Sequence, residues 1–167
     1  IGTFGARYSD VESVAEIGVD TWLDEQFSMP ISLHEPIVRR YAAQYGFNNQ
    51  DSPIPVGQFR RFAFFENALT APDQLRQVTA YALTQLFVVS QTGVLGNNPL
   101  GLSSYYDTLL THSFGNYRDL LRAVTLHPAM GFYLSHVNNG KTDPDANTFP
   151  DENYAREVMQ LFTIGIY

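Results

Sequence analysis

Cysteine is absent from the 167-residue sequence. A thiolate nucleophile, a thiolate metal site and a disulfide framework are therefore excluded, because each of them needs cysteine sulfur. The absence does not by itself indicate whether the protein resides in an oxidising or a reducing compartment.

Positive charge is scarce. Lys141 is the only lysine, and 10 basic residues against 17 acidic residues give a formal net charge of −7. A protein that binds nucleic acid needs a basic surface to neutralise phosphates. We therefore expect no nucleic-acid partner.

Long hydrophobic runs are also missing. The apolar cluster at Leu86–Val89 is typical, and such clusters fall far short of the roughly 20 apolar residues that cross a bilayer. We expect no membrane span in this chain.

Alternating strand patterns of useful length are lacking, whereas helix signals recur along a chain that is 44% hydrophobic and rich enough in aromatics to fold. The helix that follows Pro72 is expected to be the longest and most apolar. The expected helices are one between Ser9 and Gly18, Thr21–Phe27, Glu35–Tyr45, the segment QFRRFAFFENALT, one from Pro72 to about Val89, Ser103–Phe114, one from Asn116 to Leu126, and the segment PDENYAREVMQLFTIG at Pro150–Gly165.

This pattern predicts an all-α fold, an irregular multi-helix bundle around a central long helix that starts at Asp73, with the segment from Pro150 packed against that helix. No linker or repeat interrupts residues 1–167, so we expect one helical domain. The chain begins without methionine and stops directly after the apolar run FTIGIY. We expect it to be a piece of a longer protein.

The segment from Pro150 reads as an amphipathic helix with acidic residues in its first turn, where the helix dipole favours negative charge. Glu152 and Arg156 are four residues apart and should form an ion pair on the polar side. A helical projection places Asp151 near the middle of the apolar face and Glu157 on its edge. These two carboxylates therefore need a partner.

Arg76 raises the same problem on the long helix, because its direction falls between those of Leu83 and Phe87. Burying a charge costs several kcal/mol unless an opposite charge and hydrogen bonds compensate. We predict that Arg76 pairs with Asp151 or Glu157. Such a pair either locks helices together or belongs to a functional site.

Two histidines, His127 and His136, flank the segment PAMGFYLS just before an acidic loop. Histidine with carboxylates is what a transition metal or an acid/base site uses. The candidate catalytic residues are therefore Asp151, Glu152, Glu157, His127 and His136. The alternative is that these histidines are core residues hydrogen-bonded to backbone.

The loop residues Asp143, Asp145 and Asn147, followed by Asp151, have the alternating oxygen ligands of the first half of a calcium loop. The second half fails, which excludes an EF-hand. An irregular calcium site is one interpretation, and turn-forming residues around Pro144 are the other.

Aromatic residues are plentiful, and one group of them is compatible with a sugar-binding cleft as well as with a core. The group consists of Phe59, Phe62, Phe64, Phe65, Tyr105 and Tyr106. Their helical spacing favours the core.

At PDENYAREVMQLFTIG the sequence resembles the bacterial family called domain of unknown function 1800. The resemblance extends to DQLRQVTAYALTQLFVVS, to YYDTLLTHSFGNYRDLLRAVTLHPAMGFYLSH, and to TFGA with IGVDTWLDEQF, in the expected order. It implies a largely helical bacterial protein, usually exported to the periplasm or beyond the cell, whose full domain continues past this chain. It also implies a frequent gene neighbour from a family related to sulfatases and phosphatases, and no established activity.

Two functions follow as hypotheses. The first is an exported binding or assembly (scaffold) module of the cell envelope, whose partner is the product of that neighbouring gene. The second is a cell-envelope hydrolase that uses the candidate carboxylates and histidines, with a divalent metal, calcium or a transition metal, as a candidate cofactor. An enzyme should bring these groups together in one pocket, whereas a scaffold should leave them paired and dry.

Overall fold

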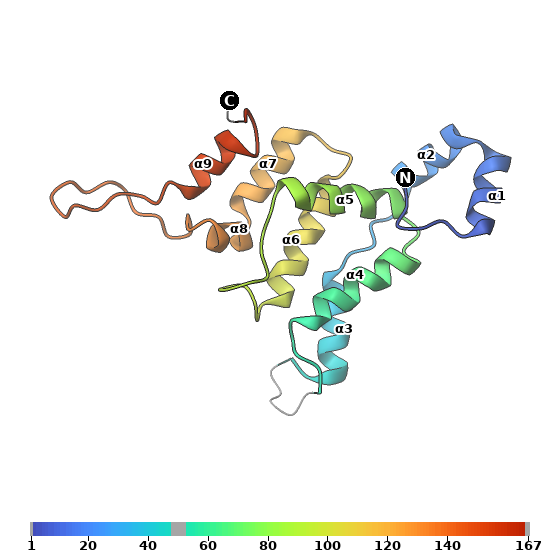
Figure 1. Ribbon diagram of the computed structural model, residues 1–167, viewed down its shortest axis with the longest axis horizontal. Helices are drawn as coiled ribbons and strands as arrows, with labels where there is room; N and C mark the ends of the chain where they lie inside the picture. The colour runs from blue at the N-terminus through green and yellow to red at the C-terminus, as the bar shows by residue number, and fades with distance from the viewer. Residues whose placement is uncertain (1, 48–52, 166–167) are drawn as a thin grey trace.

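The computed structural model describes residues 2–47 and 53–165, and within these residues it is helical without any β-strand (Figure 1). The helices are α1 (Tyr8–Ile17), α2 (Val19–Ser28), α3 (Glu35–Tyr45), α4 (Gln58–Thr70), α5 (Gln74–Leu86), α6 (Pro99–His112), α7 (Tyr117–Leu126), α8 (Pro128–Tyr133) and α9 (Asn153–Gln160). The expected all-α class is confirmed.

Several helix boundaries follow from local chemistry. α3 ends at Gly46, whose φ of 84° favours glycine. α6 begins at Pro99, four residues before the expected start, because the Asn98 side chain accepts a hydrogen bond from Gly101 N. An asparagine N-cap followed by proline at the first helical position is a strong start signal.

The helix at the centre of the fold is α6, so the expected central role of the helix after Asp73 is not confirmed. α6 contacts α3, α4, α5, α7 and α8, and its buried residues occupy several sides of the helix rather than one stripe. α5 ends at Leu86 instead of Val89, because Phe87 leaves helical geometry and buries its ring completely.

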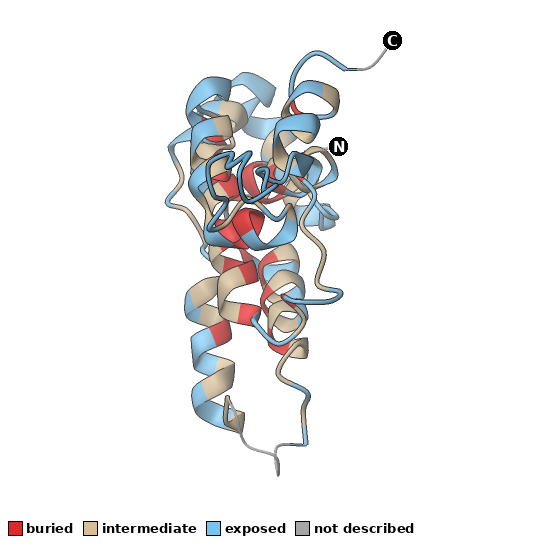
Figure 2. Cartoon of the chain, turned by 90° about the vertical axis from the view of Figure 1, so that its left-hand side faces the viewer, coloured by how far each residue is buried: buried red, intermediate tan, exposed pale blue. Residues whose placement is uncertain are grey.

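Figure 1 shows how the other elements surround α6. The pair α1 and α2 lies at one end of the molecule, α3 and α4 project together in a second direction, and the segment between α8 and α9 extends as an arm at the opposite end. One hydrophobic cluster joins α5, α6, α7 and α8 with Phe162, and a smaller one joins α3 to α4 around Val38 and Phe59. Figure 2 shows the buried residues where these helices face one another.

The connection between α2 and α3 is partly buried and is held by side chains from later helices. The backbone N–H of Ser32 donates to Asp73 Oδ2 over 3.0 Å. The carbonyl oxygen of Ser32 accepts hydrogen bonds from Asn67 Nδ2 and Gln77 Nε2, each at 2.9 Å. Backbone groups that a loop withdraws from water need partners of this kind.

None of the helices in residues 2–47 and 53–165 combines the length and the apolar character that a bilayer crossing requires.

Candidate functional site

Asp151 and Glu152 precede α9 and are exposed. The Asp151 carboxylate accepts a hydrogen bond from Asn153 N over 2.8 Å. Its backbone N–H and carbonyl are both bonded to the Asn139 side chain. The expectation that Asp151 points from the apolar face of a helix is wrong, because α9 begins only at Asn153 and Asp151 lies outside it.

The polar side of α9 behaves as expected. Glu152 and Arg156 form an exposed ion pair, which confirms the prediction for these two residues. Glu157 is partly buried, and its Oε2 atom is buried without a hydrogen-bond partner. Neither Asp151 nor Glu157 forms an ion pair with Arg76, whose surroundings are different from those expected.

Arg76 is buried among backbone carbonyls and an aromatic ring. Its Nη1 atom donates to Leu110 O over 3.2 Å, and its Nη2 atom lies 3.5 Å from Phe27 O. Its guanidinium carbon lies 4.4 Å from the centroid of the Phe114 ring. Cation–π attraction and carbonyls at a helix end therefore take the place of the expected carboxylate.

His127 caps α8 and lies beside Ser104. Its Nδ1 atom accepts a hydrogen bond from Ala129 N over 3.1 Å, and its Nε2 atom lies 3.4 Å from Ser104 Oγ. Burial lowers the pKa of His127, which favours the neutral ring, and in that ring the proton must then reside on Nε2. This tautomer donates to the serine and cannot act as its general base.

His136 also makes structural contacts. Its Nε2 atom lies 3.0 Å from the carbonyl oxygen of Thr125, which can only accept, and its ring centroid lies 4.2 Å from that of Tyr154. Neither His136 nor any of the candidate carboxylates lines the small cavity beside His127. Across residues 2–47 and 53–165, no three His, Asp or Glu side chains gather as a metal site.

The predicted calcium ligands lie in the arm between α8 and α9. Asp143, Asp145, Asn147 and Asp151 are all exposed. The Oδ1 atom of Asp143 accepts hydrogen bonds from the backbone N–H groups of Asp145 and Ala146, at 3.1 and 3.2 Å. These residues therefore form a turn that carries the tip of the arm.

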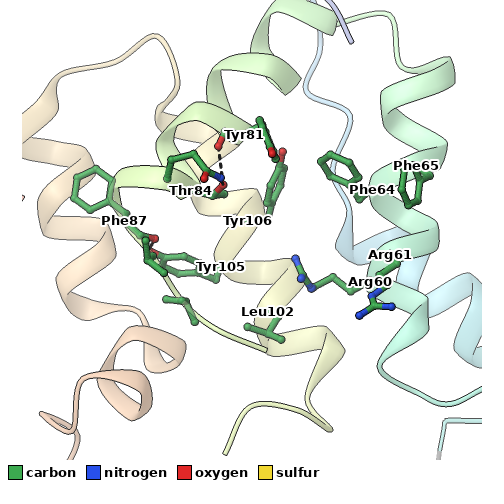
Figure 3. A pocket seen from close by; sticks show the side chains of 13 residues that line it. Arg60, Arg61, Phe64, Phe65, Tyr81, Thr84, Phe87, Leu102, Tyr105 and Tyr106 are labelled. Carbon is green, nitrogen blue, oxygen red and sulfur yellow. Dashed lines mark hydrogen bonds between the residues drawn. The ribbon is translucent and has the colours of Figure 1, made fainter. Parts of the chain in front are cut away.

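A cavity between α4, α5 and α6 lies in a region that the sequence did not single out as polar. Its volume is about 610 Å³, which is within the range of small-molecule sites. α4 and α5 share a turn at residues 71–73 and diverge from it, and α6 closes the space between them. In Figure 3, Arg60, Arg61, Phe64 and Phe65 of α4 face Leu102, Tyr105 and Tyr106 of α6.

Arg60 brings a partly buried cation to this cavity. Its Nη2 atom donates to Gln91 Oε1 over 3.3 Å, and Gln91 Nε2 donates in turn to Gly57 O over 3.1 Å. The Nε atom of Arg60 is buried without a partner. Burial, and then the charge of Arg61, lowers the pKa of Arg60.

No acidic side chain compensates these two cations. The cavity lining contains two arginines and neither aspartate nor glutamate, and Arg60 forms no ion pair within the described part of the chain. The protein as a whole carries a formal charge of −7. The cavity is thus a positive site in an acidic protein, and such a site attracts anions.

Aromatic rings form the remaining walls. The Phe64 ring lies 5.5 Å from Phe65 and 5.8 Å from Tyr81, measured between centroids. Tyr105 and Tyr106 are buried in the floor. Of the aromatic group singled out in the sequence, Phe59 and Phe62 instead belong to the core between α3 and α4.

A buried polar group lies behind the floor. Asp107 accepts hydrogen bonds from the backbone N–H groups of His34 and Glu35, at 2.7 and 2.9 Å, and burial raises its pKa to about 6. The His34 ring stacks on Tyr106 at 4.3 Å and lies 3.0 Å from Gln77 Oε1. Burial lowers the pKa of His34 to about 4, so this histidine is neutral near pH 7.

The spacing of Arg60 in the sequence already indicated that its side chain leaves the polar side of its helix. Arg60 precedes Phe64 by four residues, so it shares the aromatic side of its helix instead of the polar side. The same projection identified Arg76. His34 and Asp107 had no comparable signal, because they meet only through the tertiary fold.

Comparison with known proteins gives a family without an assigned activity. No solved structure is significantly similar to the chain. The model of the family described as "Protein of unknown function (DUF1800)" matches residues 2–167, and the chain therefore belongs to that family.

Proposed function

We propose that the chain is a binding module whose cavity between α4, α5 and α6 takes an anionic ligand through Arg60. The observation that carries the proposal is the partly buried Arg60 guanidinium, which lies at an aromatic-walled cavity and has no acidic partner. A guanidinium removed from water recovers its lost hydration best by binding an anion with two parallel hydrogen bonds.

The position of Arg60 is prepared rather than incidental. Gln91 fixes one edge of the guanidinium and is itself bonded to the backbone at Gly57. A side chain held in advance loses less conformational entropy when a ligand arrives. Gln91 thus positions the guanidinium at low entropic cost before a ligand arrives.

Binding is preferred over hydrolysis for reasons of geometry. Asp151 and Glu152 are exposed and precede α9, whereas Glu157 is partly buried within it. His127 and His136 use ring nitrogens to cap a helix and to bond a backbone carbonyl. Within the described part of the chain, this arrangement gives the hydrolase alternative no assembled acid, base and nucleophile.

The Arg60→Gln variant tests the proposal. We expect at least one of benzoate, sulfate and inorganic phosphate to raise the melting temperature of the 167-residue chain relative to sodium chloride of equal ionic strength. Titration calorimetry should show binding about 10- to 100-fold weaker in Arg60→Gln, because a charge-assisted hydrogen bond contributes about 1.5–3 kcal/mol.

Arg118→Gln is the matched control, since Arg118 is exposed on α7 and away from the cavity. It removes the same charge from the protein and should leave the affinity unchanged. Equal losses in both variants, or no binding of any of the three anions, would overturn the proposal.

We also propose, on the support of the family resemblance, that the module works in the periplasm or outside the cell and assembles with the product of a neighbouring sulfatase- or phosphatase-related gene. Fractionation of cells that express the natural gene should place the protein outside the cytoplasm. Purification under native conditions should recover the neighbouring gene product. Its consistent absence would contradict the assembly role.

A further inference from the structure

We infer that the ligand of the α4–α5–α6 cavity is a monoanion with an apolar ring system, an aryl carboxylate or aryl sulfonate, rather than a sugar acid. This inference rests on the proposed anion-binding function and adds the class of ligand. It follows from which polar groups of the cavity are already used and which are free.

Three of the four hydroxyl groups that line the cavity are committed to the protein, whereas the fourth, on Tyr81, is exposed and makes no hydrogen bond within the described residues. Tyr105 donates to Phe87 O over 2.8 Å, Tyr106 lies 3.4 Å from Gln77 O, and Thr84 Oγ1 lies 2.6 Å from Tyr81 O. A hydroxyl has a single proton. These three groups therefore cannot donate a hydrogen bond to a ligand without breaking one inside the protein.

The amide of the lining, Gln85, is exposed and donates one hydrogen bond to Thr84 Oγ1 over 3.0 Å. The Gln91 amide beside Arg60 is committed on both sides. Gln91 accepts from Arg60 through Oε1 and donates to Gly57 through Nε2. Arg60 is therefore the only donor of the lining that is withdrawn from solvent and still free, whereas Arg61, Tyr81 and Gln85 lie at the exposed rim. That distribution matches a ligand with one charged group at one end.

A sugar acid would fit this distribution poorly. Each of its several hydroxyl groups would lose water on entering, and a polar group that is buried without a partner weakens binding. The aromatic walls would stack against one face of the ring but would not replace these hydrogen bonds.

An apolar ring system would gain from the same walls. Phe65 is 60% exposed, Tyr81 45% and Val88 41%, so a ligand can still remove apolar surface from water at the rim. Burial of apolar surface contributes about 25 cal/mol per Å². The Phe64 ring lies between those of Phe65 and Tyr81. It meets the Phe65 ring edge to face and the Tyr81 ring at a tilted angle.

The charge of the ligand follows from the cations present. Arg60 is the one partly buried cation of the lining, whereas Arg61 is exposed and bonds to Gln58 over 3.4 Å. One buried guanidinium compensates one negative charge. A second buried negative charge on the ligand could be compensated only by Arg61, which is exposed to solvent.

Titration calorimetry of the 167-residue chain with four probes tests the class of ligand. The probes are 2-naphthoate, the neutral 2-naphthalenemethanol, D-glucuronate and sulfate. We expect 2-naphthoate to bind at least tenfold more tightly than each of the others. Arg60→Gln should reduce its affinity to that of the alcohol, and Arg60→Lys, which keeps the charge without the planar pair of donors, should fall between them.

The Phe65→Ala variant reports on the apolar wall, since Phe65 is exposed and its loss should leave the fold intact by circular dichroism. It should weaken 2-naphthoate severalfold and leave sulfate unchanged. D-glucuronate binding as tightly as 2-naphthoate, with both dependent on Arg60, would overturn the inference and leave the proposed function standing. Equal binding of the acid and the alcohol, unaffected by Arg60→Gln, or no binding of any probe, would overturn both.

Discussion

The His34→Gln variant is expected to lose about 3 kcal/mol of its free energy of unfolding as the pH rises from about 4 to about 6. The cause is Asp107, whose pKa is raised by burial from 3.8 to about 6. Between these values the folded protein holds a proton that the unfolded chain has released. The contribution of Asp107 to stability is therefore present below the lower value and is lost as the pH approaches the upper one.

The Asp107→Asn variant should show the opposite slope. Burial lowers the pKa of His34 from 6.5 to about 4, a shift that Gln77 and Asp73 oppose and Arg60 supports. Between these values the unfolded chain binds a proton that the folded protein does not. We expect the variant to gain about 3 kcal/mol of unfolding free energy as the pH rises from about 4 to about 6.5.

The wild-type protein contains both groups, so their opposite dependences should largely cancel between pH about 4 and about 6. Urea unfolding followed by circular dichroism at fixed ionic strength measures all the profiles. The double variant is the control and should be as flat as the wild type, at a lower overall stability. If the unfolding free energies of the two single variants changed with pH in the same direction, the opposite pKa shifts of His34 and Asp107 would be contradicted.

The Phe87→Ala variant is expected to lose about 3–5 kcal/mol of unfolding free energy, the usual cost of removing a fully buried aromatic ring. Phe87 is completely buried, and its ring lies 5.0 Å from Phe162 and 5.8 Å from Tyr117. Its carbonyl still accepts the Tyr105 hydrogen bond in the variant, so the loss measures the ring. Urea unfolding is the measurement.

Phe65→Ala removes the same ring from the same cavity and is the matched control. Because Phe65 is 60% exposed, its replacement should cost less than about 1 kcal/mol. Similar losses in the two variants would contradict the burial of Phe87 and the docking of Phe162 against it.

The fold class and several helices were predictable from local signals. The helices at Glu35–Tyr45 and Gln58–Thr70 begin and end where proline, glycine and the apolar spacing indicated. The sequence did not predict which helix is central. The run that ends at Val89 has the pattern of a long helix, but α5 stops at Leu86 because Phe87 leaves helical geometry to pack in the tertiary core. No periodicity in the sequence encodes that end point.

The candidate site was predictable only in part. The projection correctly found that Arg76 leaves the polar side of its helix, but it could not show that carbonyls and the Phe114 ring would compensate the charge. It failed for Asp151 because α9 begins only at Asn153, so Asp151 lies outside the helix and a helical projection does not describe its direction. The cavity at Arg60 could not be predicted from the sequence, because it forms only when α4, α5 and α6 pack together.

The connection between α2 and α3 has a consequence for how the chain is made. The partners of Ser32 lie in or just before α4 and α5, but Asp107, which accepts from the N–H groups of His34 and Glu35, follows only in α6. Until the ribosome has synthesised Asp107, those two N–H groups can pair only with water. The amino-terminal third of the polypeptide should therefore stay open to protease on a nascent chain that stops before Asp107, and should close once α6 has emerged.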